Sequence, residues 1–229
     1  MRPTLDTDDL AGGEPVERIR GRNATKADVL FYRLAGLDVA VKTYAPRPWW
    51  IRHGLGRWLI RREAKAFEAA AGVAGLPAFL GRLGPFALAT ERVDARPLAS
   101  LWGERLDGDV FDAVAAILDD LHRRGVAVAD LHHRDVLLAA DGSVFLVDLA
   151  MAWVLGERPG WIRRTVFRYL CDQDRVALAR MRARFTGGDV AAAVAAVGPS
   201  AAAWHARGRR LKALLDRLRG KRRPAKESP

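Results

Sequence analysis

The sequence predicts an α+β protein, with strands concentrated in the first half of the chain and helices in the second. Two stretches of strand composition, 27–34 and 37–44, are separated by the turn dipeptide Ala35-Gly36. Farther along, apolar residues recur at three- and four-residue steps, as in an amphipathic helix: Phe111, Val114, Ile117, Leu118 and Leu121. A chain of 229 residues is long enough for one domain of two small lobes, a β-rich one followed by a reduced helical one.

The first lobe is expected to span residues 16–92. The preceding residues, 1–15, are polar and rich in Asp, Gly and Pro, which predicts a flexible arm. After the two strands, an aromatic and basic segment leads into a helix that carries Glu63. Two further strand-like runs, 79–83 and 86–90, complete the predicted sheet before the chain crosses to the second lobe.

The second lobe, residues 93–203, is expected to be organised around a loop and a hairpin. The amphipathic helix should stop near Gly125, which delivers the chain to the loop that follows. Two short apolar runs, 136–138 and 144–147, are joined across Asp141-Gly142, a dipeptide suited to a tight turn. The hairpin therefore returns the chain to the loop.

This return brings Asp130, Asp135 and Asp148 to the rim of one small sheet. Three carboxylates so close together would repel one another unless cations lay between them. Carboxylate oxygens are also the ligands that Mg²⁺ prefers. The pattern therefore favours divalent metal and phosphate chemistry, and its alternative is a hairpin with scattered surface acids.

The spacing of the three acids resembles the active-site loop of the protein-kinase-like superfamily. Asp135 and Asp148 follow Asp130 by five and eighteen positions. The literal string His133-Arg134-Asp135 suggests another register, in which Asp135 would be the base. That register requires an Asn at 140 and an Asp at 153, where the chain has Ala140 and Trp153, so we reject it.

The chain further resembles the small kinase-like enzymes of lipopolysaccharide-core assembly, the Kdo and heptose kinases, with RIO-type kinases as more distant relatives. The resemblance covers roughly residues 20–185, and it includes the lead PRPWWIRHGLGRWLIRREAKAF and the triplet Asp130-Leu131-His132. It implies a bilobal protein-kinase-like fold, ATP with Mg²⁺, and transfer of the γ-phosphoryl group to a sugar hydroxyl of a membrane-held glycolipid.

The resemblance also implies a role for each site residue. Asp130 would be the base, and Asp135 and Asp148 would bind Mg²⁺. Lys42 is either a solvated strand residue or the lysine that binds the α- and β-phosphates, and the acids downstream favour the second interpretation. Glu63 is the expected partner of Lys42.

Two further expectations concern the nucleotide. Glu63 has a rival in Glu68, five residues on and on another helix face, and Glu63 itself could be an ordinary surface acid. The backbone of Glu91 and Val93, in the connection between the lobes, would meet the adenine edge. Sequence alone leaves the geometry of that contact open.

The chain departs from the kinase pattern in its lid and its loop. A glycine-rich lid lets backbone N–H groups approach phosphates, but here only Gly21 could serve, with side-chain donors from Asn23, Thr25 and Lys26. Asp135 stands where relatives have Asn, and Val128 where many have His. A degenerate pseudokinase that binds a partner and a small protein serine/threonine kinase therefore stay open as alternatives.

Composition narrows the remaining classes. The net charge is +11, which points to phosphate-bearing partners, but no aromatic platform supports a nucleic-acid partner. Cys171 is the only cysteine, so it can form no intrachain disulfide. The acidic N-terminus predicts no signal peptide, and no apolar run predicts a spanning helix. We expect a cytoplasmic monomer.

The last segment, 204–229, is predicted to be a basic amphipathic helix and tail. Nine basic residues against Asp216 alone lie within 207–223, around a leucine stripe. Such a helix either lies on the anionic inner face of the cytoplasmic membrane or packs on the domain with a solvated basic face.

Overall fold

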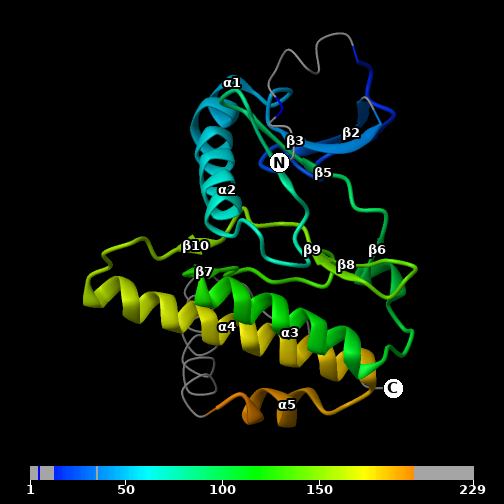
Figure 1. The fold of residues 1–229 in the computed structure, drawn as a ribbon, viewed down its shortest axis with the longest axis vertical. Coiled ribbons are helices and arrows are strands. Elements are labelled where there is room, and N and C mark those ends of the chain that lie inside the picture. The colour runs from blue at the N-terminus through cyan, green and yellow to red at the C-terminus, as the bar shows by residue number, and fades with distance from the viewer. Residues whose placement is uncertain (1–4, 6–12, 35, 199–229) are drawn as a thin grey trace, which may run out of the picture.

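The computed structural model describes residues 5, 13–34 and 36–198 of the chain. It is an α+β fold, as predicted, with a five-stranded antiparallel sheet of order β1-β2-β3-β5-β4. The strands are β1 (Glu17–Ile19), β2 (Asp28–Leu34), β3 (Leu37–Thr43), β4 (Phe79–Leu83) and β5 (Ala87–Glu91). Figure 1 shows this sheet at one end of the molecule and the long helices at the other.

Alternation along β3 gives the sheet two different faces. Val39 and Val41 are buried in an apolar cluster with residues of β4 and β5. Ala40 and Lys42, which point to the opposite face, line a cavity instead. The period of the strand therefore places Lys42 away from the apolar cluster and toward the rest of the molecule.

A helical segment beside the sheet carries the residues of the predicted aromatic and basic lead (Figure 1). It comprises α1 (Trp49–Ile51), a π-helical turn η2 (Arg52–Gly56) and α2 (Arg57–Ala69). Gly56 lets this helical segment pack closely against Tyr44, because a Cβ at position 56 would come within 2.7 Å of the Tyr44 ring. The apolar face of α2, with Ile60 and Phe67, is buried.

The second half of the chain begins with β6 and the short 3-10 helix η3, then continues through α3 to the hairpin β8–β9. Long helices α3 and α4 pack side by side beneath it, as Figure 1 shows. The elements are β6 (Arg96–Pro97), η3 (Leu98–Leu101), α3 (Gly108–Arg123), β7 (Val126–Ala127), β8 (Val136–Leu138), β9 (Val144–Leu146), β10 (Trp153–Val154), α4 (Trp161–Thr186) and α5 (Val190–Ala196).

The hydrophobic core joins these elements through one large cluster. It contains residues of α2, α3, α4 and the hairpin, among them Phe67, Leu118, Leu146 and Phe185. The hairpin register pairs Val136 with Leu146, and Gly142 has φ +86 at its turn. The loop between β7 and β8 thus rests on a packed base that fixes where its side chains can lie.

Several expectations need adjustment or fall outside the described residues. A helical scaffold is expected over 97–101 and 110–121; α3 confirms the second part, but Pro97 belongs to strand β6 and 98–101 form only a 3-10 turn. The alanine-rich stretch 190–203 predicts a last helix; α5 covers 190–196 of it, and residues 199–203 lie outside the described part. Most of the predicted arm and all of 204–229 also lie outside it. Among the described residues, no helix has the length and apolar character needed to cross a membrane.

Candidate active site

A cavity of about 670 Å³ lies where the sheet faces the loops of the second half of the chain. Its walls combine side chains from β3, α2, the β7–β8 loop and the residues after β9. Five of the charged residues singled out from the sequence line it: Lys42, Glu63, Asp130, Asp135 and Asp148. They lie up to 106 positions apart in the chain, so the fold itself assembles the cluster.

Lys42 forms two ion pairs at the centre of the cluster. Its Nζ lies 2.9–3.0 Å from the carboxylate oxygens of Glu63 and 3.0 Å from Oδ1 of Asp148. Burial would lower the pKa of Lys42, but the two carboxylates outweigh it and raise that pKa. The expected Lys42–Glu63 contact is therefore present, whereas the rival Glu68 is exposed.

Glu63 is held on the buried side of α2, where its residue is 1% exposed. Burial raises the pKa of its carboxyl to about 7, and the nearby charge of Asp148 adds to the rise. Lys42 and the backbone N–H of Leu149 act in the opposite direction. Glu63 thus depends on Lys42 for its ionised form, which makes the pair a coupled unit.

Asp148 follows β9 and begins a tight turn. Its Oδ1 accepts a hydrogen bond of 2.9 Å from the N–H of Ala150 as well as the contact with Lys42. Burial would raise the pKa of Asp148, but Lys42 and that N–H outweigh burial and lower it. Asp148 is therefore an anion at neutral pH.

Asp135 lies next to Asp148 and experiences the opposite balance. Burial raises its pKa to about 7, and the charges of Asp148 and Asp130 contribute, against Arg134 and Lys42. The backbone connects the two acids, because the N–H of Val147 donates to the carbonyl of Asp135 over 3.0 Å. A positive charge between them would offset the repulsion from Asp148 and favour the ionised form of Asp135.

The donor set fits Mg²⁺ together with phosphate better than it fits a metal held by protein alone. Among the described residues, no group of three or more His, Cys, Asp or Glu side chains is arranged to hold a metal. Mg²⁺ usually takes only one or two carboxylates and completes its shell with water and phosphate oxygens. Asp135 and Asp148 supply that number.

Asp130 stands in the β7–β8 loop, at the edge of the same cavity. Its side chain is 55% exposed, and Oδ1 lies 3.2 Å from Nε2 of His132. The preceding residue, Ala129, has φ +67, a left-handed conformation that residues with a Cβ seldom adopt. The loop is thus held in a defined, unfavourable shape just before Asp130.

The residue that holds this shape is Asp174 of α4, which the sequence reasoning missed. Its carboxylate is 1% exposed and accepts hydrogen bonds of 2.8 Å from the N–H groups of Val128 and Ala129. Nε2 of His122 lies 2.9 Å from the same carboxylate. One signal was available: Asp174 falls seven residues after buried Phe167, on the apolar stripe of the helix, where an acid requires partners.

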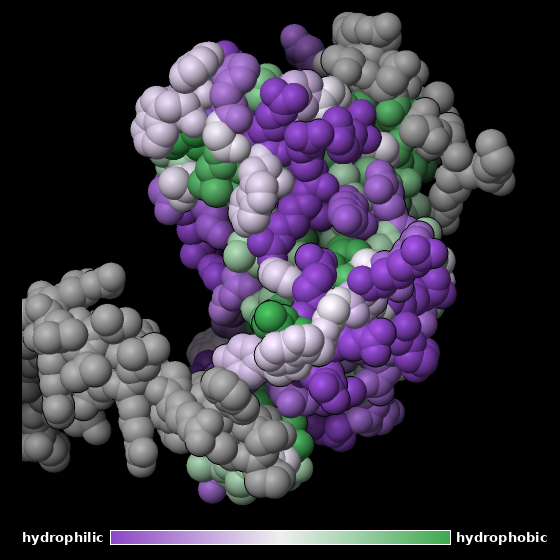
Figure 2. Space-filling view, turned by 90° about the vertical axis from the view of Figure 1, so that its left-hand side faces the viewer, coloured by the Kyte–Doolittle hydropathy of each residue, from purple (hydrophilic) through white to green (hydrophobic). Residues whose placement is uncertain are grey.

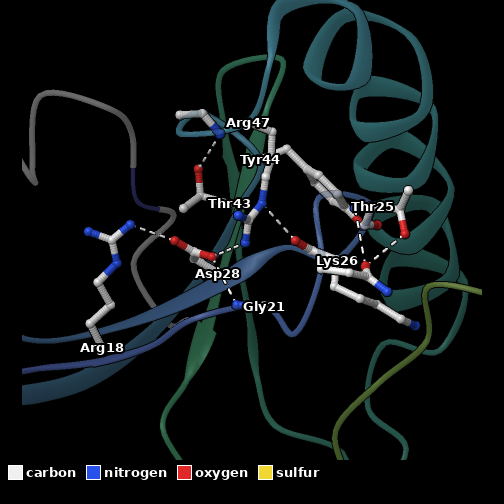
Figure 3. Close-up of polar contacts among 10 residues, drawn as sticks. Arg18, Gly21, Thr25, Lys26, Asp28, Thr43, Tyr44 and Arg47 are labelled. Atoms are coloured by element: carbon white, nitrogen blue, oxygen red, sulfur yellow. Dashed lines mark hydrogen bonds and ion pairs between the residues drawn. The ribbon is translucent and has the colours of Figure 1, made fainter.

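The loop between β1 and β2 contributes Thr25 and Lys26 to the cavity wall, and we call it the lid. Figure 3 shows the contacts that hold it, which centre on the carboxylate of Asp28 and include a hydrogen bond from Arg47 to the carbonyl of Lys26. Asp28 accepts a hydrogen bond from the N–H of Gly21 at 3.0 Å, and it pairs with Arg18 and Arg47. A Cβ on Gly21 would come within 2.5 Å of the Lys26 carbonyl oxygen. Gly21 therefore serves close packing inside the loop.

The other lid residues divide in two groups. Thr25 and Lys26 line the cavity, whereas Gly21 and Asn23 are not among its lining residues. The Asn23 side chain accepts from the N–H and the hydroxyl of Thr25, at 3.2 and 2.9 Å, and so stabilises the turn. The expected side-chain donors to phosphate therefore reduce to Thr25 and Lys26.

The connection between the two halves follows β5, and it only partly matches expectation. Val93 lines the cavity, but Glu91 is not among the lining residues, and Arg92 contributes to the wall instead. Glu91 is the last residue of β5, and its N–H donates to the carbonyl of Ala78. Arg92, which was not singled out, stacks over Phe31 at 4.1 Å and pairs with Glu17.

Comparison of the chain with protein-family models found no match, and comparison with curated proteins found none either. The interpretation of the site therefore depends on its geometry and chemistry.

Proposed function

We propose that the protein is a phosphotransferase with a bilobal kinase-like fold, which moves the γ-phosphoryl group of ATP to a sugar hydroxyl of a lipopolysaccharide-core-type glycolipid. The convergence of Lys42, Glu63 and Asp148 carries this proposal, because a lysine held between two acids can be aimed at phosphate oxygens. A cavity of about 670 Å³ is also in the size range of nucleotide and drug-sized ligand sites.

In this proposal each residue positions or neutralises charge. Lys42, aimed by Glu63, binds the α- and β-phosphates, and Val93 presents its backbone to the adenine. Asp148 and Asp135 hold Mg²⁺, which when bound neutralises the charge that spreads over the transferring group. Asp130, at the open edge of the cavity, accepts the proton of the acceptor hydroxyl.

To reach a glycolipid acceptor, the enzyme must act at a membrane surface. The side of the molecule that carries α1, η2 and α2 has features that favour membrane contact. Trp49 and Trp50 are 68% and 69% exposed, next to the basic face of η2 and α2. Figure 2 views the side where α2 and the start of α4 lie, and strongly hydrophilic residues adjoin paler ones there. Exposed tryptophans among arginines favour the interface of an anionic bilayer.

Nucleotide binding and transfer test the proposal separately. The wild type should gain thermal stability with millimolar Mg·ATP and should transfer phosphate to acceptors from a panel of lipid-A-core saccharides. Asp148→Ala should lose the metal-dependent gain. Asp130→Asn should bind Mg·ATP within a few-fold of wild type and lose transfer, because the base acts mainly in the transition state.

Three outcomes discriminate among the alternatives. Mg·ATP binding without transfer to saccharides or to a peptide library would favour the pseudokinase. Transfer to serine or threonine peptides alone would favour the protein kinase. A wild type that shows no response to Mg·ATP would overturn the proposal.

A further inference from the structure

A second, smaller cavity of about 230 Å³ lies on the other side of the β7–β8 loop. His132 lines both cavities, and its Nε2 is 3.2 Å from Asp130. A molecule in the small cavity would therefore be separated from the proposed base only by one imidazole ring. The residues that line it are Trp102, Leu131, His132, His133, Ala177, Arg180, Met181, Arg184 and Phe185.

The walls of the small cavity are positively charged. Arg180 and Arg184 come from the last turns of α4 and lie four residues apart, so both guanidinium groups reach the same face. None of the described residues that line it is acidic. Guanidinium groups present several donors in one plane, an arrangement that suits carboxylate or phosphate.

The remaining walls are apolar and aromatic. Leu131, Met181 and Phe185 are buried beneath the cavity. Trp102 is 57% exposed, and its ring lies 5.1 Å from that of His133 and 5.7 Å from that of Phe185. The guanidinium of Arg184 lies over the Trp102 ring, 5.8 Å from its centroid. The exposed remainder of the indole offers an apolar surface for the C–H face of a sugar ring, next to that guanidinium.

Backbone contacts hold these walls in place without a ligand. The N–H of Ala99 donates to the carbonyl of His133 over 3.1 Å, which connects η3 to the β7–β8 loop. The N–H of Leu106 donates to the carbonyl of Phe185 over 3.0 Å, which connects the segment after Trp102 to α4. A preformed wall loses little conformational freedom on binding, so it favours affinity.

We infer that this small cavity binds the acceptor by an anionic group on its sugar, a carboxylate or a phosphate, held by Arg180 and Arg184 with the ring against Trp102. Calling the bound sugar an acceptor rests on the proposed phosphoryl transfer, but binding of the anionic sugar does not require that transfer. His132 would then act as a positioning residue between the bound sugar and Asp130. The anion selects the substrate, and the hydroxyl to be modified extends past His132 toward the base.

Binding of three small sugars tests the inference. Glucuronate, glucose 6-phosphate and glucose are titrated into ¹⁵N-labelled protein, and the indole N–H signal of Trp102, assigned with Trp102→Phe, is followed by NMR. Both anionic sugars should shift this signal to saturation, and glucose should not shift it at the same concentrations. Inorganic phosphate, as a fourth probe, should bind more weakly than glucose 6-phosphate, because it lacks the ring.

Three variants locate the binding. Arg184→Gln and Arg180→Gln should each weaken both anionic sugars about tenfold or more, since each removes charge-assisted hydrogen bonds. Arg182→Gln is the matched control, because Arg182 lies on the same helix, pairs with Asp112 and does not line the cavity. Lys42→Met should leave the response unchanged and so exclude binding in the large cavity.

The outcomes separate this inference from the proposed function. Equal binding of glucose, an equal loss in Arg182→Gln, or no response of Trp102 to either anionic sugar would overturn it. If anionic sugars bind as expected but Mg·ATP does not bind, the phosphotransferase proposal fails and the anionic-sugar site stands. If Mg·ATP binds and anionic sugars do not, the reverse holds.

Discussion

Asp28 shows how much of the lid depends on one side chain. It is 1% exposed, yet it carries a negative charge compensated by Arg18, Arg47 and the N–H of Gly21. Burial raises the pKa of Asp28, and the hydrogen bond from Gly21 and the two arginines outweigh burial, so that the pKa lies below its ordinary value of 3.8. The arginines and the loop thus share one acceptor.

Asp28→Asn should therefore destabilise the protein in a pH-dependent way. A lowered pKa in the folded state means that the stabilisation is complete above the ordinary value of 3.8 and is lost as the pH falls through the folded value. At pH 7 we expect a loss of roughly 2 kcal/mol, which should shrink as the pH approaches about 3. Urea unfolding over this range measures it.

The control for this prediction is Asp38→Asn. Asp38 also pairs with an arginine, Arg33, but both side chains are about half exposed or more. Its substitution should change the free energy of unfolding much less than that of Asp28. A pH-independent loss in Asp28→Asn would contradict the ionic account of the lid.

Glu63 and Glu68 provide a second comparison on one helix. Glu63→Gln removes the negative charge that Lys42 contacts, so we expect Mg·ATP affinity to fall about tenfold, as for a lost charge-assisted hydrogen bond. Glu68→Gln should leave affinity within twofold, because Glu68 is exposed. Calorimetric titration decides between them, and equal effects would show that Lys42 is not aimed by Glu63.

At the scale of single elements, α4 is more than a scaffold. Through Asp174 it holds the backbone at Val128 and Ala129, 46 and 45 positions earlier in the chain. Ala129 keeps its left-handed conformation because those two hydrogen bonds fix the backbone that leads into it. A helix of the second half therefore sets the shape of the loop that carries Asp130.

Asp174→Ala should cost about 3 kcal/mol of unfolding free energy, because two buried N–H groups lose their acceptor. Asp172→Ala, two residues earlier and only partly buried, is the matched control and should cost under about 0.5 kcal/mol. Hydrogen exchange should show faster exchange at Val128 and Ala129 in the first variant alone. Unchanged exchange there would contradict the assigned role of Asp174.

Six of the ten strands in the described part of the chain were predictable from sequence, whereas the short strands β1, β6, β7 and β10 and the irregular helical turns were not. Alternating apolar residues placed β3 within one residue of its observed end, and 79–83 coincides with β4. The π-helical turn at 52–56 was not predicted, because it depends on the close approach of Gly56 to Tyr44. Such an approach is set by tertiary packing, which no local pattern encodes.

The candidate site was predictable to the same extent. The charged residues could be found because their order and spacing resemble a known pattern. The position of Asp174 on an apolar helix stripe indicates that it needs partners, but not which ones, because its contacts join distant segments. Arg92 could not be found, because its place depends on which way the chain turns after β5. The predicted contact of the Glu91 and Val93 backbone with adenine stays a prediction, although Val93 lines the cavity and Glu91 does not.

At the scale of the whole molecule, a net charge of +11 and exposed tryptophans favour an anionic surface. Replacing Trp49 and Trp50 by alanine should reduce cosedimentation with phosphatidylglycerol vesicles several-fold, because both rings would leave the interface. Trp102→Ala, at the other end of the molecule near the end of α4, should have little effect. Binding should also fall in 0.5 M salt, as screening requires.

Neutral phosphatidylcholine vesicles serve as the uncharged control in that experiment. If the double variant binds anionic vesicles as well as the wild type does, the described tryptophans have no part in membrane contact. The predicted basic helix beyond residue 203 lies outside the described residues, so deletion after Ala206 tests its share separately.

Arg62 connects α2 to the residues that follow Asp148 in the chain. It is adjacent to Glu63 on α2, and its guanidinium donates to the carbonyls of Met151 and Ala152 over 2.7 and 2.9 Å. A rotation of α2 that withdraws Glu63 from Lys42 would also withdraw Arg62 from these carbonyls. Because α2 carries both contacts, we expect that a change which displaces residues 151–152 also weakens the Lys42–Glu63 pair, and such a coupling would act equally in both directions.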